Sequence, residues 1–194
     1  PMKPSAVTFS NGADRARRDF AAYLRALMRG DIRAAHETVA QAPEEARARW
    51  RAGAAAGEPH ALWLLAYCHD AGLGVAKDKL VAERLYAAAA ERAFPAAWWM
   101  LALARENAGD LTGARDLLRP AVAAAFPPAM AALGSLLVEN PRTAEDTAAG
   151  LTLLARAADL GHAHAAEELA FVYLHGTAVP QDLRRVRHWA RRGS

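Results

Sequence analysis

The strongest constraint on this chain is that its sequence repeats at intervals of 32 to 36 residues. Four apolar stretches open on an alanine, and these alanines are 36, 32 and 36 residues apart: Ala61, Ala97, Ala129 and Ala165. A leucine follows four residues after each alanine: Leu65, Leu101, Leu133 and Leu169. An aspartate recurs in the second half of each unit: Asp78, Asp110, Asp146 and Asp182. Self-similarity at this period is typical of helical hairpins that stack into an array.

Each repeat is predicted to contain two antiparallel helices. The A helix carries the aligned alanine and leucine, and the B helix follows the aligned aspartate. An aspartate at that place can cap the B helix or lie in its first turn, where it stabilises free N–H groups and the helix dipole. One hairpin cannot bury its own apolar face, so successive hairpins must pack together. The predicted fold is all-α, a right-handed α-solenoid of stacked antiparallel helix pairs, in which the aligned alanines and leucines are the most buried residues.

The composition agrees with such a fold. Alanine accounts for 51 of the 194 residues, and alanine is the residue that enters a helix at the lowest cost in free energy. The net charge of +3, from 24 basic and 21 acidic residues, indicates a mixed surface rather than one built for a polyanion. No apolar run approaches the roughly 20 residues that a membrane-spanning helix needs.

A glycine-containing loop, GLGVAKD at 72–78, precedes one of the predicted B helices. Such a loop can bind phosphate through backbone N–H groups at a helix N-terminus. It can also be a plain turn between two helices. The equivalent loop of the last repeat, GTAVPQD at 176–182, lacks the middle glycine. A phosphate-binding loop would not recur as a connection with that glycine lost, so the sequence predicts a turn.

The stretch GHAHAAEELAFVYLHGTAVPQDLRRVRHWARRG at 161–193 resembles a Sel1-like repeat, a relative of the tetratricopeptide repeats. It contains the family's G-x-x-x-A opening, the Y-x-x-G turn, V-P-Q-D and the tryptophan of the B helix. The stretch 57–90 is similar, with His69 in place of the usual tyrosine. The resemblance implies four repeats, at 57–92, 93–124, 125–160 and 161–194, and binding through the concave surface that the A helices line.

The first 56 residues fit the repeat less well. Residues 13–56 are predicted to be an N-terminal capping segment, with a diverged tetratricopeptide-like hairpin across Gly30 and then one helix from Pro43 to Ala56. Residues 1–12 are predicted to be a tag remnant and a disordered N-terminus, because Pro1 precedes Met2. With a single cysteine and no apolar leader, a cytoplasmic location is expected, or a periplasmic one if a signal peptide has been removed.

Steps of four, three and four residues along each A helix define one stripe per repeat on the concave side. Several stripes carry aromatic residues and methionine, which are enriched at protein interfaces. The predicted partner-binding residues are Trp63, Leu64, Tyr67, Trp98, Met100, Leu103, Asn107, Glu168, Phe171 and His175. The alternative is that the N-terminal helices pack over this aromatic patch. A partner would then bind the convex or the terminal arginine-rich surface.

Three other kinds of site are less well supported. His60 and the pair His162 and His164 could bind a metal, but His162 occupies the variable place after the repeat's glycine. The run 68–70 contains the side chains of a nucleophilic triad, but consecutive residues of a helix point about 100° apart and cannot converge. The terminal arginines at 184–192 form too narrow a cluster for nucleic acid. The sequence therefore predicts no enzyme, no catalytic residue, no metal or other cofactor, no nucleic-acid partner and no membrane insertion.

The predicted function is that of an adaptor or scaffold, monomeric by default, which binds a protein or peptide in the concave groove. The resembling family also includes inhibitors of toxic effectors. An immunity protein that binds and neutralises such an enzyme is therefore the alternative, because both roles require only a shaped binding face.

Overall fold

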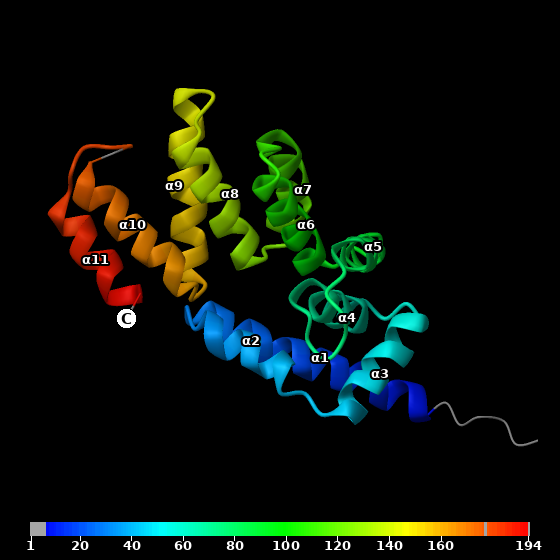
Figure 1. Ribbon diagram of the computed structural model, residues 1–194. Helices are drawn as coiled ribbons and strands as arrows, with labels where there is room; N and C mark the ends of the chain where they lie inside the picture. Colours follow the sequence, from blue (N-terminus) through cyan, green and yellow to red (C-terminus); the bar gives the residue numbers. More distant parts are fainter. Residues whose placement is uncertain (1–6, 177, 194) are drawn as a thin grey trace, which may run out of the picture. The chain divides into compact units, whose positions relative to one another are not determined.

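The computed structural model describes residues 7–176 and 178–193, with side chains from Ala13 onward. These residues form eleven α-helices and no strand (Figure 1), which confirms the predicted all-α class. Residues 1–6, which carry half of the predicted disordered terminus, lie outside the described residues. In the described part of the chain, no helix combines the length and the apolar character that crossing a membrane requires.

The helices follow one another along the chain with short connections. Their bounds are α1 (Val7–Met28), α2 (Ile32–Ala40), α3 (Glu44–Ala55), α4 (Pro59–Ala71), α5 (Lys79–Ala90), α6 (Pro95–Asn107), α7 (Leu111–Ala123), α8 (Pro127–Glu139), α9 (Ala144–Asp159), α10 (Ala163–His175) and α11 (Leu183–Gly193). Helix α1 begins at Val7, so the prediction that disorder extends to residue 12 is wrong for its second half. Once a helix has nucleated, adding residues at its end costs little, so the amphipathic segment that follows extends backward.

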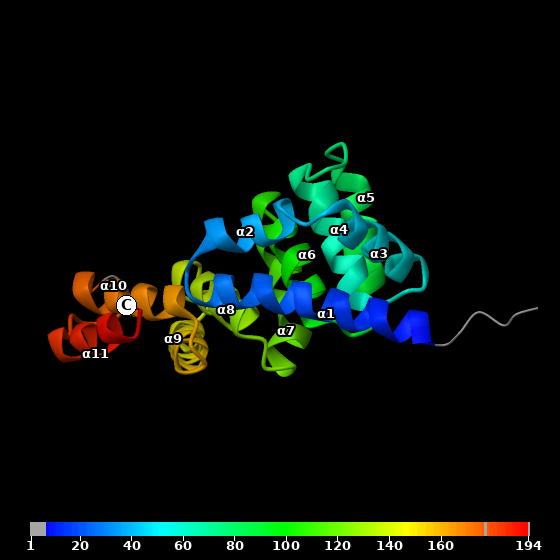
Figure 2. The same ribbon diagram turned by 90° about the horizontal axis from the view of Figure 1, so that it is seen from below.

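The chain divides into two compact units. The first comprises the chain up to Ala26 together with Ile32–Ala97, and the second comprises Leu27–Asp31 together with the residues from Trp98 onward. In the first unit, α4 packs against α5 and α3 packs against α4. In the second unit, α8 packs against α9 and α10 against α11, with α9 and α10 also in contact. Both views show α10 and α11 side by side (Figure 1, Figure 2).

The recurring aspartates do mark the starts of the B helices. Asp78 and Asp110 are N-caps, whose carboxylates accept hydrogen bonds from N–H groups three residues later at 3.0 and 2.8 Å. Asp182 accepts from the first N–H groups of α11 at 2.9 and 3.1 Å. Asp146 lies in the first turn of α9, behind its N-cap Thr143. The prediction of a cap or a first-turn acid is confirmed in each case.

The two loops that resemble each other in sequence also share their hydrogen bonds. Gly72 ends α4 and Gly176 ends α10, both in the left-handed conformation with φ of 76° and 64°. The N–H of Asp78 donates to the carbonyl of His69 at 2.9 Å, and that of Asp182 donates to Tyr173 at 3.0 Å. The loop at 72–78 is therefore a repeated turn, because it needs glycine for the left-handed residue that ends the helix.

The aligned alanines form the centre of the packing, since Ala61, Ala97, Ala129 and Ala165 are all fully buried. Leu133 and Leu169 are buried as well. Leu65 and Leu101 are only half-buried, so their predicted place in the core is wrong. In α4 the buried face instead includes Leu62, Trp63 and Leu64, because α3 and helices from the N-terminal segment also pack on this helix.

Helices α8 and α9 approach each other through two glycines. A Cβ atom added at Gly150 would lie 2.7 Å from the carbonyl oxygen of Gly134 and 2.8 Å from Cγ2 of Val138. A Cβ atom added at Gly134 would lie 2.9 Å from the carbonyl oxygen of Gly150. Backbone atoms cannot move aside without shifting a whole helix, so this contact requires glycine on both sides.

We therefore expect Gly150→Ala to lower the free energy of unfolding by about 1–2 kcal/mol. Overpacking typically costs about 1–3 kcal/mol, and the higher helix propensity of alanine offsets up to about 1 kcal/mol of it. Urea denaturation would measure the change, with the exposed neighbour substitution Ala149→Ser as a control expected to stay within about 0.5 kcal/mol. A more stable Gly150→Ala variant would contradict the close contact.

Candidate functional site

The ten residues predicted to bind a partner lie on α4, α6 and α10, and they fall into two groups. Trp63, Leu64 and Tyr67 belong to the first unit. The other seven belong to the second unit: Trp98, Met100, Leu103, Asn107, Glu168, Phe171 and His175. Each group is described here as a separate surface of its own unit.

In the first unit, α1 covers the predicted binding surface with aromatic side chains. The rings of Phe20 and Tyr23 lie 5.0 and 4.7 Å from the ring of Trp63, and the Trp63 indole N–H donates to the carbonyl of Ala96 at 3.2 Å. Trp63 and Leu64 are fully buried. Their assignment to a partner-binding surface is therefore wrong. They are core residues, since α1 supplies the contacts that a partner would have made.

Tyr67 is also committed to contacts within the first unit. Its ring stacks on Trp63 at 5.4 Å, and its hydroxyl is 3.2 Å from Nδ1 of His36 on α2. Burial, followed by the nearby charge of Asp70, raises the pKa of Tyr67. The half-buried Tyr67 thus joins α4 to α2, and the packing of N-terminal helices over this aromatic patch matches the alternative that the sequence left open.

In the second unit the equivalent face of the A helices remains more open. Trp98, Met100 and Leu103 on α6 are half-buried, and Asn107 at the end of this helix is exposed. On α10, Phe171 is 57% exposed. His175, one turn further along, is also exposed, and its ring lies 4.3 Å from the ring of Phe171.

Carboxylates from three successive A helices add a polar part to this face. The Ser135 hydroxyl on α8 donates a hydrogen bond to Oε2 of Glu168 at 2.6 Å. Burial raises the pKa of Glu168, and the negative charge of Glu139 raises it further. Burial and the same charge of Glu139 also raise the pKa of Glu106 on α6. Glu139 is therefore near enough to both Glu106 and Glu168 for its charge to act on each of them.

We call this surface the second-unit A face, and it comprises Trp98, Met100, Leu103, Glu106, Asn107, Ser135, Glu139, Glu168, Phe171, Leu174 and His175. Sequence reasoning missed Glu106 and the 42% exposed Leu174. Both lie nine residues after an aligned alanine, Ala97 and Ala165, and therefore hold the same place in their repeats. Had the predicted binding surface included this ninth position on each A helix, both residues would have been predicted.

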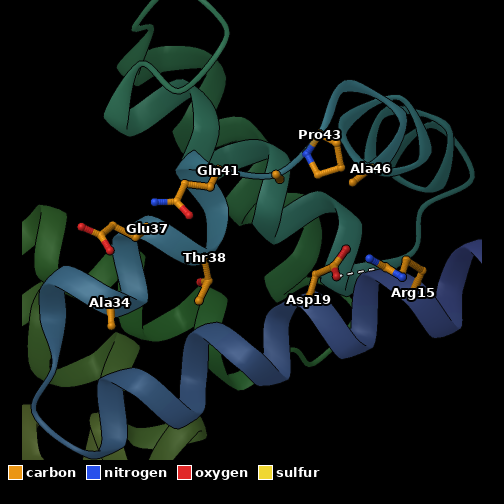
Figure 3. Close-up of a pocket in the computed structure, with 9 residues that line it drawn as sticks. Arg15, Asp19, Ala34, Glu37, Thr38, Gln41, Pro43 and Ala46 are labelled. Atoms are coloured by element: carbon orange, nitrogen blue, oxygen red, sulfur yellow. Dashed lines mark ion pairs between the residues drawn. The ribbon is translucent and has the colours of Figure 1, made fainter.

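The first unit contains a pocket of about 410 Å³ between α1, α2 and the start of α3, with both charged and apolar lining residues (Figure 3). Arg15 and Asp19 form an ion pair of 3.2 Å on its α1 side. Asp19 also accepts a hydrogen bond of 3.0 Å from the indole N–H of Trp50, and Glu37 on α2 pairs with Arg33. The charged groups at the pocket are therefore already paired with neighbouring side chains. We interpret the pocket as part of the packing between these helices.

Neither the possible triad nor the histidines form a reactive site. Cys68 is buried, and burial raises the pKa of its thiol to about 11. The neighbouring His69 and Asp70 are half-buried residues of the same helix. His60 pairs with Glu58 at 2.8 Å, and His162 caps α10 through a hydrogen bond from the N–H of Ala165. Among the described residues, no three His, Cys, Asp or Glu side chains are grouped so that they could hold a metal ion.

Helix pairs with capped B helices, glycine turns and an alanine-lined core define a helical repeat protein of the α-solenoid class. The sequence model of the Sel1 repeat matches residues 59–94, 127–162 and 163–194, which is more than half of the chain. The chain belongs to the Sel1 repeat family. Sel1 repeat proteins generally mediate protein–protein interactions, and the family is typically a non-catalytic interaction module.

Two solved structures are similar to this chain. A Sel1 repeat protein from Oxalobacter formigenes is 28% identical with a TM-score of 0.59, and the match covers 72% of this chain and 59% of that one. A protective antigen present in uropathogenic Escherichia coli strains, displaying an SLR fold, is 26% identical with a TM-score of 0.67; the match covers 76% of this chain and 32% of that one. This chain thus spans less than two thirds of the length of either relative. The comparison with curated proteins gives no match.

Trp63 and Phe171 hold aromatic rings in opposite environments, and we expect their removal to have opposite consequences for stability. Trp63→Ala should lower the free energy of unfolding by about 3–5 kcal/mol, because it empties a fully packed site. Phe171→Ala should change it by less than about 1 kcal/mol, because the ring is mainly in solvent. Urea titration of both variants measures the contrast, and equal losses would show that Phe171 is a core residue.

His162 makes stability depend on pH through its buried cap. Burial, together with the nearby charge of His164, lowers the pKa of His162 from 6.5 to about 4. The neutral ring therefore stabilises the folded state above pH 6.5, and this contribution is lost as the pH falls toward 4. We expect the wild type to lose on the order of 2–3 kcal/mol relative to His162→Asn, which caps without titrating, between pH 7 and 4. Parallel pH profiles of the two proteins would contradict this assignment.

Proposed function

We propose that the chain is a non-enzymatic interaction module of the adaptor type, which binds a peptide or protein segment on the second-unit A face. The observation that carries this proposal is the exposure of Phe171 and Leu174 on the same helix as the polar Glu168 and His175. The proposed setting is the cytoplasm of a bacterium, since both solved relatives are bacterial and the one cysteine gives no support for a disulfide-rich protein.

The apolar part of this face supports binding because it has the character of an anchor site. Phe171 is 57% exposed and Leu174 is 42% exposed, whereas large apolar residues normally contribute to a core. Met100 and Leu103 add half-buried apolar surface on α6. Contiguous apolar surface with a polar rim is a common mark of a protein interaction site, and aromatic and methionine side chains are enriched there.

The polar part supports a partner that donates hydrogen bonds. Glu168 is fixed by the Ser135 hydroxyl, so its carboxylate is held in one place before any partner binds. Asn107 and His175 are exposed at the same end of their helices, ten residues after the aligned alanines. Polar groups placed beside apolar anchors fix the register of a bound peptide.

The first unit contributes in a different way. Its A helix has lost the equivalent surface to α1 and α2, through the ring contacts of Trp63 and the His36–Tyr67 hydrogen bond. We propose that residues 13–56 cap the array, and that residues 93–124, which contain α6 and α7, are a diverged repeat between the repeats that the family sequence matches. The Asp110 cap of α7, which is equivalent to the Asp78 cap of α5, supports this assignment.

The proposal can be tested with peptides selected by display on the purified 194-residue chain. Dissociation constants of the selected, labelled peptides would be measured by fluorescence anisotropy for the wild type, Phe171→Ala and Met100→Ala. We expect each variant to weaken binding at least tenfold, or about 1.4 kcal/mol, because anchor side chains at interfaces commonly contribute that much.

Leu80→Ala provides the matched control. Leu80 on α5 is 66% exposed and lies in the first unit, so it offers an apolar side chain outside the proposed surface. Its removal should change the dissociation constants by less than twofold. Peptides that bind all four proteins equally, or that respond to Leu80→Ala alone, would show that the second-unit A face is not the binding surface.

A further inference from the structure

The second unit also carries a pocket on its B helices, which shares no residue with the second-unit A face. The pocket has a volume of about 550 Å³. One wall of the pocket is formed by α9, with Ala148, Leu151, Thr152 and Ala155. The other wall is formed by α11, with Arg185, His188 and Trp189, and α10 contributes Tyr173. We call it the B-face pocket.

The α9 wall and Trp189 make the pocket apolar and wide enough for a side chain. Ala148, Thr152 and Ala155 lie on one face of α9 and carry short side chains, which leaves room beside the larger Leu151. Trp189 is half-buried and packs against the core of the second unit. An aromatic wall opposite small residues is a shape that accepts one inserted apolar side chain.

Arginines are frequent on α11, the helix that forms one wall of the pocket. Helix α11 carries five arginines, none of its residues is buried, and Arg184, Arg187 and Arg191 are exposed. Arg185 is held at the pocket wall, because its guanidinium donates to the Tyr173 hydroxyl at 2.5 Å and lies over the Tyr173 ring at 4.9 Å. His188 lies beside it, with its ring 4.6 Å from the ring of Trp189.

Acidic groups near α11 neutralise only part of this charge. Asp182 lies 3.4 Å from Arg185, and Asp159 on α9 pairs with Arg192, whose guanidinium also lies over the Trp189 ring. Both acids lie outside the residues that line the pocket. The wall that faces an occupant therefore combines an aromatic ring with the positive charge of a fixed arginine.

We propose that the B-face pocket is a second interaction surface, which binds an acidic peptide segment carrying one large apolar side chain. The apolar side chain would insert between Trp189 and the short side chains of α9, and a flanking carboxylate would face Arg185. Charge complementarity selects this occupant, since a basic segment would be repelled. With a partner on each surface, the second unit would hold two proteins at once.

Nucleic acid fits the same surface less well. Nucleic-acid binding depends on a broad basic stripe that follows many phosphates, and here the basic residues lie on a single eleven-residue helix of a chain with net charge +3. The pocket itself is lined mainly by alanine, leucine, threonine and aromatic side chains, with Arg185 as the one arginine among the described lining residues. An apolar side chain can contact most of this lining, whereas a phosphate would be recognised by Arg185 alone.

The test uses three labelled nine-residue peptides, each with a central Leu, Phe or Trp between glutamates, and the full-length protein. Fluorescence anisotropy should give a dissociation constant below 1 mM for at least one of them, with binding that weakens as salt rises. Ala148→Phe fills the pocket from an exposed position and should weaken the binding of that peptide at least tenfold.

Arg185→Gln, which keeps a donor for the Tyr173 hydroxyl, should weaken the binding of the same peptide about fivefold. The control Arg49→Gln, an exposed arginine on α3 of the first unit, should leave it unchanged.

Several outcomes would overturn the proposal. They are no binding of any of the three peptides at 1 mM, equal binding of a peptide whose central residue is serine, or undiminished binding by Ala148→Phe. A labelled single-stranded oligonucleotide that binds more tightly than the acidic peptides, and responds to Arg185→Gln but not to Ala148→Phe, would identify a nucleic-acid surface instead. Circular dichroism of each variant confirms that the helices are retained. The binding of peptides to the second-unit A face should be unaffected by Ala148→Phe. This difference separates the two proposals.

Discussion

The close approach of helices across residues without large side chains is the contact on which the rest of the structure depends. The four aligned alanines are fully buried, and Gly134 and Gly150 bring the backbones of α8 and α9 within a distance that no Cβ atom allows. Because so much of the core consists of methyl groups, each large side chain that does enter it fills a specific gap. Protein interiors are packed to a uniform density, so helices with small side chains must lie close together.

The two units differ in how far the same A-helix surface is buried. In the first unit, an aromatic cluster built around Trp63 joins α4 to the N-terminal helices and adds a large apolar core. In the second unit, the positions equivalent to Trp63 and Tyr67 are occupied by Glu167 and Phe171 on α10, and both residues are exposed. One repeat architecture therefore has a covered A-helix surface in the first unit and an exposed one in the second.

The repeat period, the capping aspartates and the glycine turns could all be predicted from the sequence, because each depends on residues close together in the chain. Burial of Trp63 and Leu64 could not, because a helical period shows which residues share a face but not which distant segment covers it. The half-buried state of Leu65 and Leu101 has the same origin, as it depends on how many neighbours a helix acquires. The B-face pocket escaped prediction because it results from the sizes of side chains on two helices from different repeats.

Burial makes the thiol of Cys68 unreactive. Its thiol is enclosed on α4 with a pKa near 11, and the thiolate is the form that attacks disulfides and is readily oxidised. At neutral pH almost none of that form exists, and the sulfur is buried, with Arg47 and Arg51 of α3 nearby. In the folded protein Cys68 is therefore a poor target for oxidation or disulfide exchange.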